Sequence, residues 1–216
     1  MMTRLYPKSK VEVQGFEARH YDRFMDLVTL GAYPGFLRRV FDRMDLQPGQ
    51  RILDLGAGTG RNTAIIADHI GENGSVWGVE LGDEMARGFQ RRCSGRENCH
   101  LIRGRIDEPL DLEPGFDKAF ISFVIHGLPH ENRLKVLENV QRLLKPGGWF
   151  VVLDYKQRAN IGAFRKFMFT KVECPYSLDY IRRDWHEILS EYGLVVQRED
   201  LFFFRTVSLL QAQKKV

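Results

Sequence analysis

A glycine-rich turn follows a short apolar segment in the first third of the chain. The segment Ile52-Leu-Asp-Leu-Gly-Ala-Gly-Thr-Gly60 places glycines at alternate positions, and Asn62 follows shortly after them. Glycine adopts backbone conformations that residues with a Cβ resist, so the chain can pass close to a bound molecule there. A helix that begins behind the turn would also offer free N–H groups. The pattern predicts a ligand-binding turn, with a turn that only connects two elements as the alternative.

The spacing of Gly56, Gly58 and Gly60 differs from that of a dinucleotide-binding turn. The dinucleotide fingerprint reads Gly-x-Gly-x-x-Gly, and its third glycine lets the helix pack closely on the strand. In this chain the third glycine comes one residue early. The turn therefore departs from the dinucleotide fingerprint.

An acidic residue follows the turn at the distance expected for a nucleoside-binding site. Glu80 comes twenty residues after Gly60, at the end of the next predicted strand. A carboxylate there can accept hydrogen bonds from both hydroxyls of a ribose. Leu81 lies beside it, and Met85 could lie over a base as a soft, polarizable contact. An acid at a strand end is often only a cap, but its distance from the glycine turn favours binding.

A histidine at a predicted strand end is the candidate for proton transfer. His126 follows the predicted strand Phe116 to Val124, at the edge where sheets of this class bind ligands. Its unperturbed pKa, roughly 6.5, suits a general base near neutrality. The alternative is a structural histidine bonded to loop backbone. Asp154 and Tyr155 end another predicted strand at the same edge.

Short strands alternate with helices over the middle of the chain, which predicts a parallel sheet with helices on both faces. The expected strands are Arg51 to Leu55, Ser75 to Glu80, Cys99 to Gly104, Phe116 to Val124 and Trp149 to Asp154, and the expected helices are Phe16 to Leu30, Phe36 to Met44, Arg61 to Ile70, Asp83 to Arg92, Glu131 to Leu144 and Tyr180 to Tyr192. Two further strands, Leu194 to Glu199 and Phe203 to Gln211, are too close in sequence for a helical crossover. We expect that pair to be antiparallel.

Composition predicts one domain and no bilayer span. The chain has 216 residues, 44% of them hydrophobic, and a net charge of +4 with a pI near 9.0. Its basic residues are scattered in pairs with acids beside most of them, as on a solvated surface, so nucleic acid binding is not favoured. Without a signal peptide or an apolar run of spanning length, we expect a cytoplasmic protein. Three cysteines without a Cys-x-x-Cys pair predict no metal site.

These segments resemble the class I S-adenosylmethionine-dependent methyltransferases. ILDLGAGTG, VWGVELGDEM and RLLKPGGWFVVLD are similar to successive signature segments of that superfamily, and the resemblance extends from about Gln14 to the C-terminus. The entry Tyr21-Asp-Arg-Phe-Met25, Ile121-Ser-Phe123 and the closing FFRTVSL look like those of the menaquinone and ubiquinone C-methyltransferases.

The resemblance implies a Rossmann-like seven-stranded fold of strand order 3-2-1-4-5-7-6, with strand 7 antiparallel. It implies S-adenosylmethionine as the cofactor and S-adenosylhomocysteine as the product. The cofactor would be bound by Asp54, Gly56, Ala57, Gly58, Gly60, Asn62, Glu80, Leu81, Met85, Ile106, Asp107 and Ser122. Asp54 would hold the amine of the cofactor through water or backbone. Residues 1–46 would form a helical lid and 47–216 the methyltransferase domain of a single globular unit. Tyr21 in that lid is a second candidate catalytic residue.

Two positions depart from the pattern of the family. Where the superfamily often has Gly-Asp-Ala, this chain has Gly104-Arg105-Ile106 and then Asp107, so the adenine contact falls either to Asp107 or to the backbone of Ile106. Where the quinone enzymes carry Arg-Asn, this chain has His126-Gly127, as many other small-molecule methyltransferases do. The second departure argues against a quinone substrate.

The aromatic stretch Lys156 to Ser177 has two interpretations. Its apolar side chains form either part of the core or the wall of a pocket for a flat acceptor. Cys174 lies within it, and arsenic methyltransferases of this fold use several thiolates, so one pocket thiol is too few for that chemistry.

A small-molecule methyltransferase, acting as monomer or homodimer, is the function that the sequence favours. An RNA or protein methyltransferase is the second hypothesis, and a non-catalytic S-adenosylmethionine-binding protein is the third. The acceptor atom, carbon, oxygen or nitrogen, stays open.

Overall fold

The computed structural model describes residues 9, 15, 22, 26, 27, 29–156 and 175–216. Their strands form one sheet in the order β3-β2-β1-β4-β5-β7-β6. The strands are β1 (Arg51–Leu55), β2 (Ser75–Glu80), β3 (Cys99–Arg103), β4 (Phe116–Ser122), β5 (Leu144–Tyr155), β6 (Leu194–Phe202) and β7 (Val207–Lys214). β1 to β5 pair in parallel, and β7 is antiparallel to both of its neighbours. The predicted fold class and strand order are confirmed.

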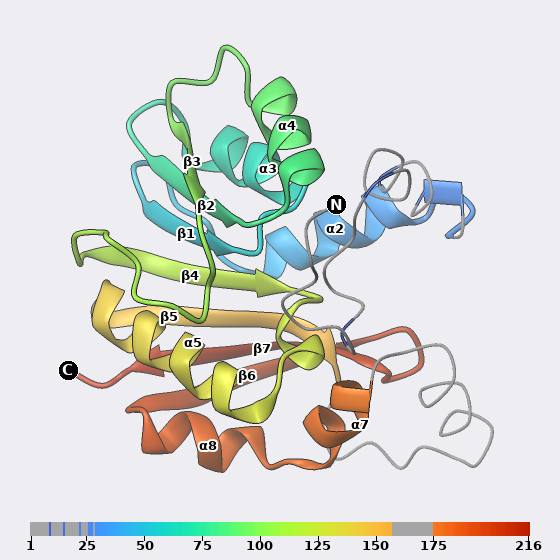
Figure 1. Ribbon diagram of the computed structural model, residues 1–216, viewed down its shortest axis with the longest axis vertical. Helices are drawn as coiled ribbons and strands as arrows, with labels where there is room; N and C mark the ends of the chain where they lie inside the picture. The colour runs from blue at the N-terminus through green and yellow to red at the C-terminus, as the bar shows by residue number, and fades with distance from the viewer. Residues whose placement is uncertain (1–8, 10–14, 16–21, 23–25, 28, 157–174) are drawn as a thin grey trace.

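Helices cover both faces of the sheet (Figure 1). They are α2 (Tyr33–Arg43), α3 (Arg61–Ile70), α4 (Asp83–Arg92), the short 3₁₀ helix η1 (Ile125–Gly127), α5 (His130–Leu143), α7 (Pro175–Arg182) and α8 (Trp185–Glu191). α2 and α3 pack on one face, where Ile52 and Phe120 are buried, and α5, α7 and α8 pack on the other, where Leu53 and Ile121 are buried. This alternation along each strand is what a sheet with two covered faces requires.

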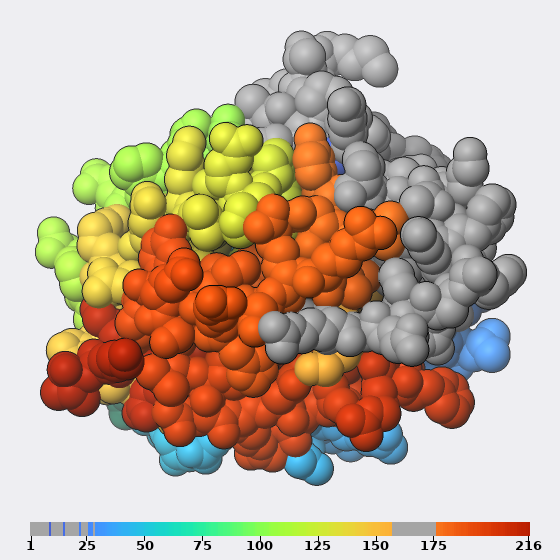
Figure 2. All heavy atoms as spheres, turned by 90° about the horizontal axis from the view of Figure 1, so that it is seen from below, coloured from blue at the N-terminus to red at the C-terminus, as the bar shows by residue number. Residues whose placement is uncertain are grey.

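The face opposite α2 carries the C-terminal helices. In the space-filling view from below, α7 and α8 lie beside α5 and over the last two strands (Figure 2). Trp185 and Tyr180 are fully buried there, with their rings 4.8 Å apart. Aromatic pairs of this kind stabilise a core beyond their buried area. The two helices are therefore part of the main core.

The predicted single helix Tyr180 to Tyr192 is wrong, because the structure has two helices there. α7 ends at Arg182, and Asp184 takes an extended conformation before α8 begins. The Asp184 carboxylate accepts hydrogen bonds from the backbone N–H groups of His186 and Glu187. Aspartate is a preferred N-cap because it satisfies the free N–H groups of a first helical turn. Gly193 follows α8 and its cap with φ +70°, the left-handed conformation that commonly ends a helix.

The last two strands differ from the prediction at the turn between them. Phe203, Phe204 and Arg205 were expected to begin the final strand, but all three have left-handed φ angles of 46–63° and form the turn. Aromatic residues favour strands by composition, so the pattern suggested a strand. The ring of Phe203 instead packs on Phe36 of α2, with centroids 4.7 Å apart.

The fifth strand was expected to begin at Trp149, but β5 begins at Leu144 and includes Lys145 to Gly148. The pairing of β4 with β5 shifts register there, between Phe116 and Lys118. A Cβ at Gly148 would lie 2.9 Å from the carbonyl oxygen of Lys145, which only glycine avoids. The glycine therefore permits a bulge in the strand.

Candidate functional site

The glycine turn connects β1 to α3 at the carboxyl edge of the sheet. Gly56, Gly58 and Gly60 have φ angles of +75°, +56° and +75°. A Cβ at Gly56 would lie 2.8 Å from a Val124 methyl group, and one at Gly60 would lie 2.9 Å from the Phe89 ring. A Cβ at Gly58 would meet nothing within 4 Å. Two glycines are thus required by packing, while the space over Gly58 is open, as a turn that receives a ligand needs.

Glu80 connects this turn to the beginning of α4. One carboxylate oxygen accepts the N–H of Gly58 at 2.9 Å, and the other accepts the N–H of Gly82 at 2.6 Å. Burial raises the pKa of this carboxyl, although the backbone hydrogen bonds oppose that shift. Each carboxylate oxygen accepts more than one hydrogen bond, so the pair of oxygens still suits two hydroxyl donors.

Asp54 lies beneath the turn, at the end of β1. Its side chain is 1% exposed, and the hydroxyl of Thr63 donates to it at 2.6 Å. Burial raises the pKa of Asp54 to about 7, with a smaller contribution from Glu80 nearby. A buried carboxyl of this kind would be stabilised as a carboxylate by a cationic group brought above it. Thr63 was not predicted, because a threonine inside a helix pattern carries no sign of its partner.

The pKa of Asp54 makes the stability of the protein depend on pH. Between 3.8, the ordinary value, and about 7, the folded chain binds a proton that the unfolded chain has lost. We expect the free energy of unfolding contributed by this group to be present below pH 3.8 and to fall as the pH rises to about 7. Asp54→Asn should remove that fall in denaturant titrations over pH 4–8. The exposed Asp111→Asn serves as the control, and equal pH profiles for the two variants would contradict the prediction.

The two residues expected to contact adenine, Asp107 and Ile106, are hydrogen-bonded to other residues of the protein. The carboxylate of Asp107 accepts two hydrogen bonds from Arg105, at 2.8 and 3.1 Å, and one from Asn132 at 2.6 Å. The carbonyl of Ile106 accepts the side-chain N–H of Asn139 at 2.9 Å. Arg105 therefore neutralises the acid beside it. Which of Asp107 and Ile106 would contact adenine stays a prediction.

The other predicted cofactor residues lie around the same edge. Ala57 is buried in the turn, and its N–H donates to the carbonyl of Val79 at 3.0 Å. Met85 is buried in the first turn of α4, where its side chain would be 3.7 Å from a Cβ at Gly82. Leu81 follows β2, Asn62 lies in the first turn of α3 and Ser122 ends β4. Their contacts with a cofactor remain predictions.

His126 lies in η1, directly after β4, and is buried. Its ring Nδ1 lies 2.8 Å from a carboxylate oxygen of Asp154, which is fully buried at the end of β5. The ring centroids of Tyr155 and His126 are 4.8 Å apart, and those of Phe123 and Tyr155 are 6.1 Å apart. Phe123 has a φ of +53°, an uncommon conformation for a residue with a Cβ and one that is found at functional sites. Sequence reasoning did not identify Phe123, because no pattern reports a backbone angle.

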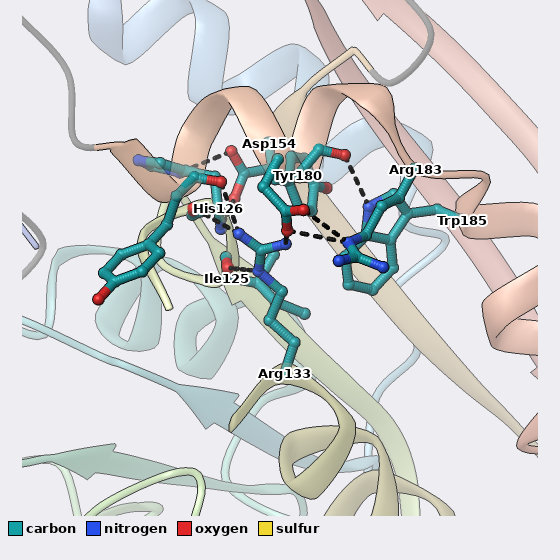
Figure 3. Close-up of polar contacts among 9 residues, drawn as sticks. Ile125, His126, Arg133, Asp154, Tyr180, Arg183 and Trp185 are labelled. Atoms are coloured by element: carbon teal, nitrogen blue, oxygen red, sulfur yellow. Dashed lines mark hydrogen bonds and ion pairs between the residues drawn. The ribbon is translucent and has the colours of Figure 1, made fainter. Parts of the chain in front are cut away.

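Arg133 joins the His126 loop to α7 (Figure 3). Its guanidinium reaches from α5 and donates to the carbonyls of Ile125 and His126, each at 3.1 Å, and to that of Tyr176 at 2.6 Å. It also forms an ion pair with Asp179 at 2.7 Å. Arg133 is completely buried. Sequence reasoning did not identify it, because an arginine in an amphipathic helix usually faces solvent.

Two acids of the N-terminal segment bind the glycine turn and its neighbours. The carboxylate of Asp22 accepts hydrogen bonds from the Thr59 hydroxyl at 2.9 Å and from Arg92 at 2.6 Å. Asp26 accepts one from Arg61 at 2.8 Å. These contacts attach Asp22 and Asp26 to the turn and its neighbours, and the lid itself stays a prediction. Tyr21, most of the helix Phe16 to Leu30, and Cys174 with most of the aromatic stretch lie outside the described residues.

Three acids and an open turn make the site suitable for a cationic nucleoside. Asp54, Glu80 and the glycine turn lie at one edge of β1 and β2, and His126 with Asp154 lies at the same edge of β4 and β5. Among the described residues, no group of three His, Cys, Asp or Glu side chains could hold a metal ion. Within the same part of the chain, no helix has both the length and the apolar character that crossing a bilayer requires.

Comparisons with known proteins agree with this geometry. Residues 52–148 match the family model described as a methyltransferase domain. A demethylmenaquinone methyltransferase from Geobacillus stearothermophilus is 30% identical over 152 residues, which cover 69% of this chain and 64% of the relative. The chain thus spans less than two thirds of the length of that relative.

Solved structures share the fold at lower identity. A SAM-dependent methyltransferase from Aquifex aeolicus matches with a TM-score of 0.64 and 22% identity, covering 82% of this chain and 88% of that one. Aeropyrum pernix fibrillarin, in a structure with natively bound S-adenosyl-L-methionine, matches with a TM-score of 0.58 and 22% identity, covering 77% and 67%. At 22% identity, these similarities show a shared fold.

Proposed function

Because the chain belongs to the class I S-adenosylmethionine-dependent methyltransferases, we propose that it transfers the methyl group of that cofactor to a small-molecule acceptor. The observation that carries the proposal is the carboxylate of Glu80, hydrogen-bonded to both the glycine turn and the start of α4. That arrangement provides two acceptor oxygens beside an open turn, as a ribose with two hydroxyls needs.

The residues of the site fit the charge of this cofactor. S-adenosylmethionine carries a sulfonium and an amine, and the buried Asp54 with its raised pKa would gain from a cation above it. When bound, the cofactor supplies a methyl group that is already activated for in-line substitution. The protein then needs to orient the acceptor opposite the sulfur and exclude water. Asp22 and Asp26 support a covering role for the N-terminal segment, because both bind the edge of the cofactor turn.

Calorimetric titration with S-adenosylmethionine and with S-adenosylhomocysteine tests the proposal directly. We expect saturable binding of both at micromolar to millimolar concentrations, and no competition by a nicotinamide dinucleotide. Transfer of a labelled methyl group to metabolites of low molecular mass would then identify the acceptor. Absence of binding at millimolar cofactor would overturn the proposal, and a salt-sensitive transfer to RNA would replace the small-molecule acceptor by a macromolecule.

Glu80→Ala should weaken cofactor binding by about 1–3 kcal/mol, because hydrogen bonds to a charged group are lost. That corresponds to roughly a 5- to 150-fold rise of the dissociation constant, which calorimetry measures. Glu72→Ala is the matched control, since Glu72 is exposed in the turn after α3. Equal dissociation constants for wild type and Glu80→Ala would exclude the ribose assignment.

A further inference from the structure

We infer that Cys93 and Cys99 form a redox-active dithiol, which a hydroperoxide converts to an intrachain disulfide, and that this bond weakens cofactor binding at the glycine turn. The first part depends only on the two thiols and their neighbours. The second part rests on the proposed function, because it concerns the regulation of that same site. The proposed transfer of a methyl group uses neither thiol.

The two thiols contact each other across the loop between α4 and β3. Cys93 caps the end of α4 and Cys99 begins β3, and both pack in the small apolar cluster that includes Ala57 and Phe89. The loop consists of two turns, in which the N–H of Arg96 donates to the carbonyl of Cys93 at 3.0 Å and that of Cys99 to the carbonyl of Arg96 at 3.3 Å. The thiol of Cys99 donates a hydrogen bond to the sulfur of Cys93. The sulfurs are thus already neighbours, as a disulfide requires.

The surroundings give the two thiols different roles. The hydrogen bond from Cys99 lowers the pKa of the Cys93 thiol. The charges of Arg96 and Arg92 lower this pKa further, against the effects of burial and of the charge on Asp54. The same hydrogen bond raises the pKa of Cys99. Cys93 is therefore the thiolate that attacks an oxidant, and Cys99 is the thiol that resolves the product.

The oxidation is balanced by the hydroperoxide itself. The thiolate sulfur of Cys93 attacks one oxygen of the peroxide, the oxygen–oxygen bond breaks, and water or an alcohol leaves as it takes up a proton. The sulfur of Cys99 then attacks the sulfenic acid at Cys93, the disulfide forms, and the proton of Cys99 leaves with the hydroxyl group as water. The two thiols are oxidised and the peroxide is reduced. Cys93 is 8% exposed, so the oxidant must be small.

The start of β3 is fixed, so the new bond displaces the end of α4. Cys99 pairs with Val76 of β2. The side chain of Asn98 donates to the carbonyls of Ala67 and Gly71, at 3.2 and 2.9 Å. A disulfide brings its sulfurs to about 2 Å from each other, closer than two hydrogen-bonded thiols lie. The end of α4 must therefore move when the bond forms.

The end of α4 holds the cofactor turn through Arg92. Its guanidinium donates to the hydroxyl of Thr59 at 2.8 Å and to the carbonyl of Thr59 at 3.3 Å. It also donates to the carboxylate of Asp22 at 2.6 Å. Thr59 lies between Gly58 and Gly60, so a displacement of Arg92 changes the conformation of the turn that would receive the cofactor.

Tryptic mapping without reduction tests the disulfide. Trypsin cleaves after Arg92, Arg96 and Arg103, which places Cys93 and Cys99 in separate peptides. After treatment with a small molar excess of hydrogen peroxide and alkylation of the remaining thiols, we expect these peptides to be joined and to separate with dithiothreitol. The chain should stay monomeric on a non-reducing gel. Two alkylated peptides, or a bond from either of them to a second chain, would overturn the inference.

Single serine variants test the roles of the two thiols. In Cys99→Ser, oxidation of Cys93 should stop at the sulfenic acid, which dimedone labels. In Cys93→Ser, Cys99 should take up little dimedone, because it lacks the arginines that stabilise the Cys93 thiolate. Equal labelling of the two variants, or stronger labelling of Cys99, would overturn the assignment of the attacking thiol.

Calorimetry with S-adenosylhomocysteine tests the effect on the proposed site. The oxidised protein should bind it at least about fivefold more weakly than the reduced protein, and dithiothreitol should restore the affinity. Cys93→Ser is the matched control, and its dissociation constant should be the same before and after peroxide. Equal affinities of oxidised and reduced wild type would overturn the coupling to the turn. A reduced protein that binds no cofactor would contradict the proposed function, whereas the tryptic peptides test the disulfide in either case.

Discussion

Replacing Arg133 by methionine is expected to lower the free energy of unfolding by about 2–4 kcal/mol, because buried carbonyls lose their donor. The guanidinium, itself completely buried, donates to three backbone carbonyls that come from η1 and α7. Its partner Asp179 is 40% exposed and also pairs with Arg183, so the ion pair itself contributes little. Methionine fills the space of the stem but leaves the carbonyl of His126 without this hydrogen bond.

Urea titrations followed by circular dichroism would measure the free energy of unfolding of Arg133→Met and of the wild type. Lys135→Met is the matched control, because Lys135 is an exposed cation on the same helix, and its change should stay within about 0.5 kcal/mol. Equal stability of the two variants would contradict the prediction, because it would mean that water replaces the guanidinium at no cost.

Gly60→Ala is the second substitution with a large expected effect. Gly60 has a φ of +75°, where an L-residue costs about 1–2 kcal/mol. The new methyl group would also lie 2.9 Å from the Phe89 ring and 3.1 Å from the Phe89 Cα, and overpacking of this kind costs about 1–3 kcal/mol more. The variant should be destabilised and should also bind the cofactor more weakly, because the turn must shift.

Gly71→Ala reports the cost of a Cβ at positive φ without a steric contact. Gly71 has a φ of +70° and a Cβ there would meet nothing within 4 Å, but its ψ of −177° differs from the 14° of Gly60. A double variant with Phe89→Leu therefore separates the two contributions at Gly60. Phe89→Leu combined with Gly60→Ala should lose less stability than the sum of the single variants, since the smaller side chain relieves the clash. Strict additivity would place the cost of Gly60→Ala in the backbone and not in the Phe89 contact.

Much of the fold was predictable from the sequence because its elements bury regular patterns. The central strands and the helices α3 and α4 lie where apolar periodicity and glycine punctuation placed them. The errors share one cause: they arise where a single residue or a tertiary contact decides the local structure. Apolar periodicity predicts one continuous helix where Asp184 begins a second one. Composition predicts a strand at Phe203, but the chain turns there and the Phe203 ring packs on Phe36.

The candidate site was less predictable than the fold. The glycine turn and Glu80 carry a local pattern, and the structure brings them together through a 2.9 Å hydrogen bond. Asp154 was expected at the same edge as His126, but their contact depends on the register of two strands. The role of Arg133 depends on α7, which follows it by more than forty residues, and no local pattern reports such a distance.

The position of β7 has a consequence for the order in which the chain can assemble. β7 lies between β5 and β6, although it follows both of them in the chain. Until the ribosome has synthesised β7, β6 has no strand to pair with. The edge of β5 that later pairs with β7 also stays unpaired until then. Open strand edges of this kind pair readily with other chains. Nascent or prematurely terminated chains that lack residues 207–214 should therefore depend on chaperones and be removed by proteases.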